Sequence, residues 1–118
     1  MNPPVKMLII YVDESDIWGA SHAPLYEAIV LKARAMHVAG ATVLRGPIGF
    51  GPSSRLHTTK MLRLSQDLPL LIEIVDTKEK IDEFLPVLDG MMGSGLVTLE
   101  KVQVLQYGKA GVASPERA

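Results

Sequence analysis

Two strand–helix–strand patterns follow one another in this chain, and they limit the folds that it can adopt. The predicted strands and helices lie, in order, at 5–12, 24–39, 41–45, 69–75, 76–90 and 96–107. The order β-α-β-β-α-β predicts an α+β fold, a ferredoxin-like sandwich with two helices on one face of an antiparallel sheet. The 118 residues have the length of one domain. We therefore expect a single domain over 1–118, with a core at about 5–107 and a flexible tail at 108–118.

Hydrophobic continuity separates the central strands from the edge strands. The runs at 5–12 and 70–75 are almost unbroken apolar sequence, as expected of strands in the middle of a sheet. Glu73 interrupts the second run and shares a face with Leu71 and Val75, because side chains alternate along a strand. We expect Glu73 to pair with a cation or to face a subunit junction. The face without helices is also apolar, which predicts an oligomer.

The helix boundaries have sequence signals. Pro24 suits the first turn of the first helix, and Gly40 is the expected stop at its end. Asp76 and Glu79 have the spacing of a capping box at the start of the second helix. Pro86 falls inside that helix, where it removes a backbone hydrogen bond, so we expect a kink or an exposed face there.

Composition excludes several classes of protein. The formal net charge of −1 argues against a general nucleic-acid or membrane-surface binder, so any anion site must be local. Cysteine is absent, which excludes disulfides and thiolate metal sites and fits a reducing compartment. No signal peptide is indicated, and the apolar runs are too short to cross a bilayer. We expect a cytoplasmic protein without direct membrane insertion.

The segment 46–57 is the strongest candidate for a functional site. It contains three glycines, and basic residues follow them with a single acidic residue nearby. These residues are Gly46, Gly49, Gly51, Arg55, His57, Lys60, Arg63 and the acidic Asp67. Bare backbone N–H groups and cationic side chains together suit an anion. The alternative interpretation is a long hairpin connection whose basic residues are solvated.

Two other features have both a structural and a functional interpretation. Asp13, Glu14 and Asp16 end the first strand, where short side-chain acceptors favour a turn. Three carboxylates could also hint at a hard cation, but their spacing matches no full calcium loop. Trp18 is the single tryptophan. We expect it to be a lid on one end of the core, and stacking on a base at a subunit boundary is the alternative.

Several motifs together resemble those of a known family. They are the segments 41–51 (Ala-Thr-Val-Leu-Arg-Gly-x-x-Gly-Phe-Gly), 54–58 (Ser-Arg-Leu-His-Thr), 64–69, 72–81 and 95–102. This combination resembles the bacterial and archaeal group called domain of unknown function 190, over about residues 7–107. That group is similar to the PII signalling proteins, which are ferredoxin-like homotrimers. PII proteins bind adenine nucleotides in clefts between subunits and engage partner proteins through a mobile loop after the second strand.

The resemblance implies roles for individual positions. Gly49–Gly51 matches the Gly-Phe-Gly at the base of the PII loop, and Gly93–Gly95 matches the turn that cradles phosphates. Leu96 follows that turn where PII proteins have a basic residue, and no cationic pair is evident after Val102. The ligand could therefore be a triphosphate or a smaller or less charged molecule, and the resemblance does not decide between them. The residues expected at the ligand are Gly49, Phe50, Gly51, Arg55, His57, Gly93, Ser94 and Gly95.

The resemblance favours a regulatory binding protein. A homotrimer would bind an adenine nucleotide at its subunit clefts and present the loop 51–67 to a partner, such as a membrane transporter or channel. The alternative is a divalent-metal-binding trimer resembling the cation-tolerance proteins, which requires His22, His37 or His57 to meet carboxylates of another subunit. We expect no enzyme, because no nucleophile–base pair or paired carboxylates stand out.

Overall fold

The computed structural model describes residues 4–19, 22–46, 48–49, 57–58, 68–93 and 95–108. Its elements are β1 (Val5–Asp13), β2 (Ile17–Trp18), β3 (Ala23–Pro24), α1 (Leu25–Ala35), β4 (Ala41–Arg45), β5 (Ile48–Gly49), β6 (His57–Thr58), β7 (Pro69–Thr77), α2 (Lys78–Met91) and β8 (Leu96–Val102). The predicted α+β order is confirmed, and the short pairs β2–β3 and β5–β6 are additions to it.

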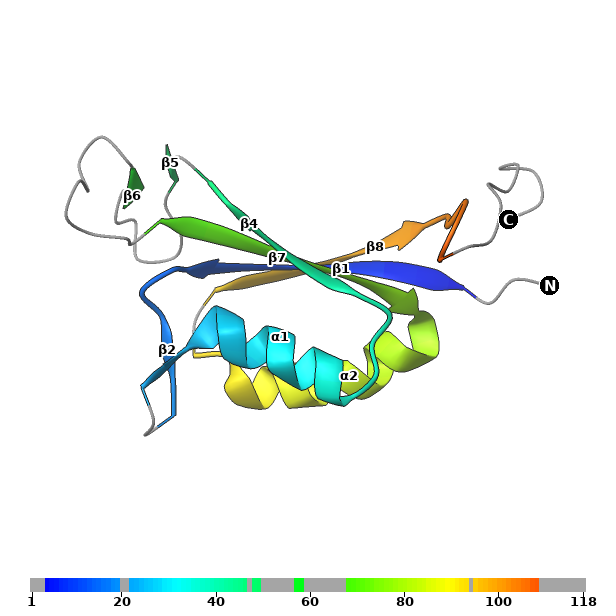
Figure 1. Ribbon diagram of the computed structural model, residues 1–118, viewed down its shortest axis with the longest axis horizontal. Coiled ribbons are helices and arrows are strands. Elements are labelled where there is room, and N and C mark those ends of the chain that lie inside the picture. The colour runs from blue at the N-terminus through cyan, green and yellow to red at the C-terminus, as the bar shows by residue number, and fades with distance from the viewer. Residues whose placement is uncertain are drawn as a thin grey trace.

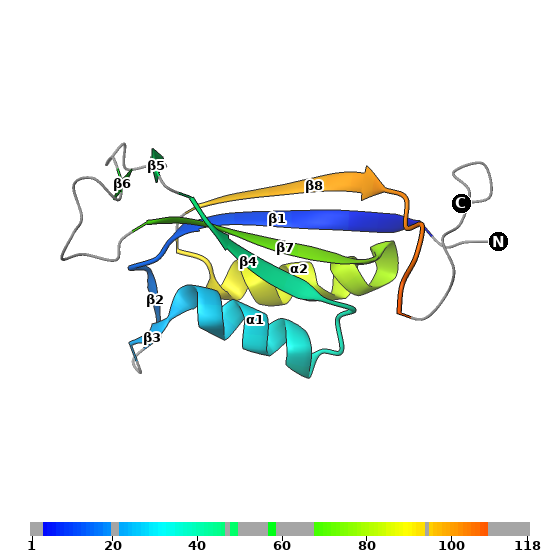
Figure 2. The same ribbon diagram turned by 45° about the horizontal axis from the view of Figure 1, so that its top comes forward.

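A four-stranded antiparallel sheet forms one layer of the protein. Its strand order is β4-β7-β1-β8, so β1 and β7 occupy the centre, as their apolar sequences predict. Both helices lie on the same face of this sheet (Figure 1, Figure 2). Neither helix of the described chain is long and apolar enough to span a membrane.

The core lies between the sheet and the two helices. Alternate residues of β1 and β7 face each other in register, for example Leu8 with Ile74 and Ile10 with Ile72, and all four are fully buried. The helices add a buried stripe at helical spacing: Leu25, Ile29, Ala33, Ile81, Phe84 and Leu88. Aliphatic side chains therefore fill most of the core, with one aromatic ring, Phe84, among its fully buried members.

The end of α1 differs from the prediction. Gly40 is not the stop, because the helix ends at Ala35 and His37 adopts the left-handed conformation with φ of 61°. The Val38 N–H donates to the Ala33 carbonyl at 3.0 Å, which completes a Schellman motif around His37. A histidine therefore occupies the position that glycine usually takes.

The start of α2 also differs by one residue from the predicted capping box. Thr77 is the N-cap, and its side chain accepts a 3.3 Å hydrogen bond from the Lys80 N–H. Asp76 still belongs to β7, and its carboxylate accepts hydrogen bonds from the N–H groups of Ala39 and Thr77. The aspartate thus ties the α1–β4 connection to the sheet instead of capping the helix.

Pro86 lies inside α2, which continues from Lys78 to Met91. The proline is exposed, which agrees with the expectation of an exposed face at this position. Near the start of this helix, Lys78 Nζ donates a 2.6 Å hydrogen bond to the Asp82 carboxylate one turn later. This hydrogen bond raises the pKa of Lys78 above its ordinary value.

The last strand is shorter than the predicted range of 96–107. β8 ends at Val102, because the following residues leave the β1 edge. The Tyr107 hydroxyl then donates to the Ala39 carbonyl at 3.1 Å. The alternating apolar residues after Val102 therefore belong to a segment that crosses toward the α1–β4 connection.

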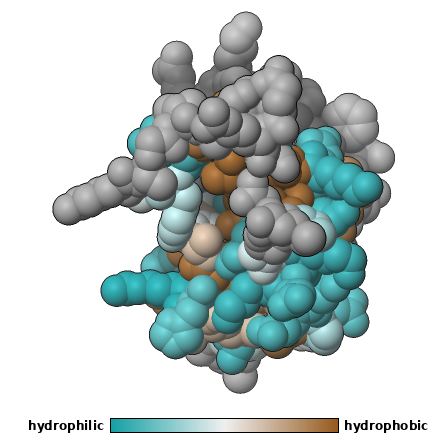
Figure 3. Space-filling view, turned by 90° about the vertical axis from the view of Figure 1, so that its right-hand side faces the viewer, coloured by the Kyte–Doolittle hydropathy of each residue, from teal (hydrophilic) through white to brown (hydrophobic). Residues whose placement is uncertain are grey.

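The second face of the sheet carries no helix in the described structure (Figure 2). One row across it is Leu44, Leu71, Tyr11 and Leu96, from the four strands in order. The adjacent row places Glu73 between Thr42 and Ile9, and Glu73 shares its face with Leu71 and Val75 as predicted. In Figure 3, hydrophobic surface gathers at the level of the sheet and hydrophilic surface covers the helix layer.

Candidate ligand site

The segment that contains the glycine-rich motif leaves and rejoins the sheet at one end. On one side, the Gly46 N–H donates to the Pro69 carbonyl at 2.8 Å. On the other side, the Glu14 N–H donates to the Leu68 carbonyl at 2.8 Å. The start of β7 is therefore held between the end of β4 and the turn after β1, which fixes both ends of the segment.

An ion pair spans the same end of the sheet. The Arg45 guanidinium donates through Nη2 to Oε2 of Glu14. The Glu14 side chain is 8% exposed, whereas that of Arg45 is 55% exposed. Sequence reasoning missed this pair because Arg45 ends β4 and Glu14 follows β1, and these two strands are separated by β7. Only the strand order brings them together.

Two of the predicted ligand residues pair with each other through the backbone. Gly49 of β5 lies opposite His57 of β6 in a short antiparallel ladder. Phe50, Gly51 and Arg55 lie outside the described residues, and their predicted roles stay predictions. The ladder thus brings two residues of the 46–57 segment, Gly49 and His57, next to each other.

The second glycine turn precedes β8. Gly95 has φ of +137°, and a Cβ there would lie 2.7 Å from the Tyr11 carbonyl oxygen and 2.8 Å from Cε of Met92. Gly93 has nothing within 4 Å of such a Cβ, and Ser94 is outside the described residues. Gly95 is therefore required by close packing of the backbone, which is a structural reason independent of any ligand.

The two glycine regions lie at the same end of the sheet but at its opposite edges. Leu44 of β4 and Leu96 of β8 occupy one row, with β7 and β1 between them. Three strand spacings of about 4.8 Å separate these edges by about 14 Å. The sheet of a single chain does not bring the two predicted halves of the site together.

The carboxylates at the end of β1 lie in a turn. The Asp13 N–H donates to Oδ2 of Asp16 at 2.9 Å, and the Asp16 N–H donates to the Asp13 carbonyl at 3.0 Å. Within the residues that the structure describes, no group of three or more His, Asp and Glu is placed to hold a metal ion. His22 and His37 both adopt positive φ, of 57° and 61°, at turns far apart in the sequence.

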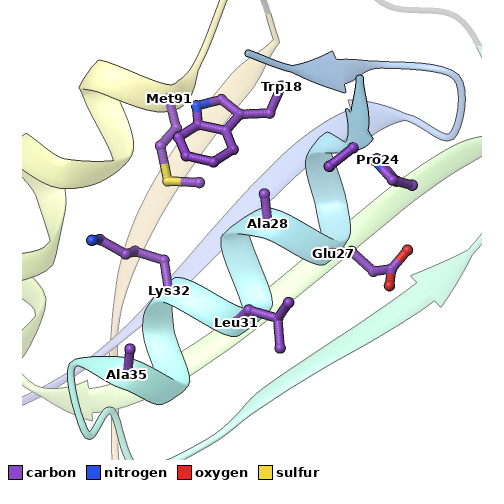
Figure 4. A pocket seen from close by; sticks show the side chains of 9 residues that line it. Trp18, Pro24, Glu27, Ala28, Leu31, Lys32, Ala35 and Met91 are labelled. Atoms are coloured by element: carbon purple, nitrogen blue, oxygen red, sulfur yellow. The ribbon is translucent and has the colours of Figure 1, made fainter. Parts of the chain in front are cut away.

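Trp18 does not close the core, contrary to expectation. Its side chain is 41% exposed and lines a shallow groove of about 340 Å³ on the outer side of α1. Figure 4 shows the indole beside Met91, with Ala28 and Leu31 on the helix below. The β2–β3 pair, in which Trp18 lies opposite Ala23, places the indole over this groove and not among the buried core residues.

Comparisons with known proteins agree with this architecture. Residues 5–104 match the DUF190 family, described as "Uncharacterized ACR, COG1993". A UPF0166 protein of Aquifex aeolicus is 34% identical over 100 residues, which cover 85% of this chain and 92% of the relative. A UPF0166 protein of Methanocaldococcus jannaschii is 32% identical over 100 residues, covering 84% and 90% respectively.

A solved structure shares the fold. It is CPII, a nitrogen regulatory PII-like protein from Thiomonas intermedia K12, bound to ADP, AMP and bicarbonate. The TM-score is 0.59 at 19% sequence identity, and the match covers 86% of this chain and 88% of CPII. The family match over most of the chain also confirms the resemblance stated from the motifs. This protein therefore belongs to the DUF190 family and has the PII-like fold.

Proposed function

We propose that this chain is a PII-like regulatory protein that binds an adenine nucleotide without converting it. The ligand would occupy clefts between the subunits of a homotrimer, and the loop 51–67 would engage a partner protein such as a membrane transporter or channel. The proposal is supported by the shared fold with CPII, whose structure holds ADP and AMP.

The observation that carries the proposal is the separation of the two glycine regions. They lie at the same end of one sheet but about three strand spacings apart, roughly 14 Å. A second copy of the chain placed along a sheet edge could supply the missing half of the site. This separation supports the proposal that the ligand binds between subunits.

The face of the sheet opposite the helices supports assembly. The row nearest the glycine turns is made of Leu44, Leu71, Tyr11 and Leu96, and the first and last of these are about half exposed. Covering apolar rows of this kind with a second surface lowers the free energy, because apolar area is removed from water. Copies of the same face are a suitable cover in a cyclic oligomer.

The test combines mass and ligand measurements on the full chain. Light scattering after gel filtration should give the mass of three chains. Thermal unfolding should be measured with AMP, ADP, ATP, cyclic nucleotides and divalent metals. A ligand at a hundredfold excess over Kd stabilises the folded state by about 2.7 kcal/mol. The resulting rise in melting temperature is readily measured.

Each outcome has a distinct meaning. A trimer stabilised by an adenine nucleotide that is recovered intact, with weaker stabilisation in Arg55→Ala, agrees with the proposal. Stabilisation only by metals would favour the cation-tolerance alternative, and turnover of the nucleotide would favour an enzyme. A monomer that binds nucleotide would contradict the subunit cleft while leaving nucleotide binding in place.

A further inference from the structure

The ion pair between Arg45 and Glu14 is asymmetric. The Glu14 carboxylate is more than nine-tenths buried, while the Arg45 side chain is more than half exposed. Glu14 uses Oε2 to accept from Nη2 of Arg45, and its Oε1 is buried with no hydrogen-bond partner in the described structure. Breaking the contact would leave a buried carboxylate without a charged partner, which costs free energy. The contact therefore holds the guanidinium in place.

Both members of the pair stand on fixed backbone. Gly46, next to Arg45, donates to the Pro69 carbonyl, and Glu14 itself donates to the Leu68 carbonyl. The guanidinium has five N–H donors in a planar fork, and the contact with Glu14 engages one of its nitrogens, Nη2. The remaining donors belong to a side chain that is open to solvent. Within the part of the chain that the structure describes, Arg45 is therefore an oriented cation whose other guanidinium nitrogen atoms have no hydrogen-bond partner.

The distribution of charge over the described residues makes Arg45 distinctive. Lys6 and Lys101 face each other near the start of β1 and the end of β8, which is the opposite end of the sheet. Lys78 and Lys80 begin α2 beyond the end of β7, also at that opposite end. Among the lysines and arginines of the described strands, Arg45 is the one at the end with both glycine turns.

We propose that Arg45 binds the phosphate of the nucleotide and that Glu14 is its positioning residue. This inference rests on the proposed function and names a contact that the predicted set of site residues did not contain. A phosphate accepts hydrogen bonds from a guanidinium fork in a planar, bidentate geometry, which a mobile lysine does not reproduce. Glu14 contributes by holding the fork in one orientation before the ligand arrives.

The experiment measures ligand affinity by calorimetry for the full-length protein and four variants. The probes are adenosine, AMP, ADP and inorganic pyrophosphate. The variants are Arg45→Gln, Arg45→Lys, Glu14→Gln and the control Arg34→Gln, which removes an exposed positive charge from the last turn of α1. Thermal unfolding of each variant checks that it is folded.

Arg45→Gln should weaken AMP, ADP and pyrophosphate by about tenfold or more while leaving adenosine unchanged. Arg45→Lys keeps the charge and loses the fork, so it should give a smaller loss with the same ligand pattern. Glu14→Gln should also weaken only the phosphate-bearing probes. The Arg45→Gln complex with ADP should depend less on salt than the wild-type complex, because one screened charge contact is gone. Arg34→Gln should bind like wild type.

Unchanged ADP affinity in folded Arg45→Gln would overturn the inference and leave the proposed function standing. An equal loss for adenosine and ADP would assign the pair a purely structural role. If Arg45→Gln does not fold, Arg45→Lys and Glu14→Gln decide the question by the same comparison of probes. A wild-type protein that takes none of the phosphate-bearing probes would overturn both the inference and the proposed function.

Discussion

The backbone at Gly95 passes so close to the carbonyl oxygen of Tyr11 that a side chain has no room between them. A Cβ would lie 2.7 Å from that oxygen, and φ at this glycine is +137°. Gly95→Ala should therefore lower the free energy of unfolding by about 2 kcal/mol. Urea denaturation measures the change. Gly93→Ala is the matched control, because its Cβ would meet open space; equal losses at both positions would contradict the interpretation.

Replacing His37 should stabilise the protein. The residue has φ of 61° at the position after α1 where glycine is favoured. His37→Gly should raise the free energy of unfolding by about 1 kcal/mol, since it removes the Cβ that disfavours this conformation. His37→Ala keeps the Cβ and should give little gain. If both variants gave the same thermal midpoint, backbone strain at residue 37 would not be the cause.

The N-cap of α2 can be identified by substitution. Thr77→Ala removes the side-chain acceptor of the Lys80 N–H and should cost about 1 kcal/mol of stability. Thr77→Ser retains a hydroxyl and should remain close to wild type in thermal unfolding. A loss in Thr77→Ser as large as that in Thr77→Ala would show that the methyl group, and not the hydrogen bond, matters.

Glu14 and Arg45 should be coupled in stability as well as in ligand binding. Arg45→Gln leaves a buried carboxylate without its charged partner and should cost about 1–3 kcal/mol. In a Glu14→Gln background the same change should cost less, because the buried charge is already gone. A double-mutant cycle by urea denaturation gives the coupling energy, and strict additivity would show that the two side chains act independently.

The uncovered face of the sheet predicts which exposed leucine affects assembly. Leu44 is 48% exposed on that face, and Leu31 is 58% exposed on the outer side of α1. Leu44→Glu should shift the proposed oligomer toward monomers, whereas Leu31→Glu should leave the mass unchanged. Light scattering over a range of protein concentrations makes the comparison. The reverse pattern would move the interface to the helix layer.

Sequence patterns predict the large features of this fold because burial decides them. The apolar runs in β1 and β7 and the helical stripe that includes Phe84 follow from hydrophobic periodicity alone. Element ends are less predictable, since single hydrogen bonds decide them. Thr77 replaces Asp76 as the cap, and His37 replaces Gly40 as the stop.

The candidate site was predictable only in part. The glycine turns are visible in the sequence, and the structure pairs Gly49 with His57. The Glu14–Arg45 pair depends on strand order, which no local pattern contains. Trp18 was misplaced because a short β2–β3 pair, and not the core, determines its position.

The two backbone hydrogen bonds at Gly46 and Glu14 have a consequence for how this protein can diversify. They tie the residues on both sides of the 47–67 segment to the same end of the sheet. The entropic free-energy cost of closing a loop grows slowly with its length, by about 0.6 kcal/mol for each doubling. The segment can therefore lengthen, shorten or change its residues at small cost to folding. If the segment engages a partner as proposed, one scaffold can in this way serve different partners while its core sequence stays the same.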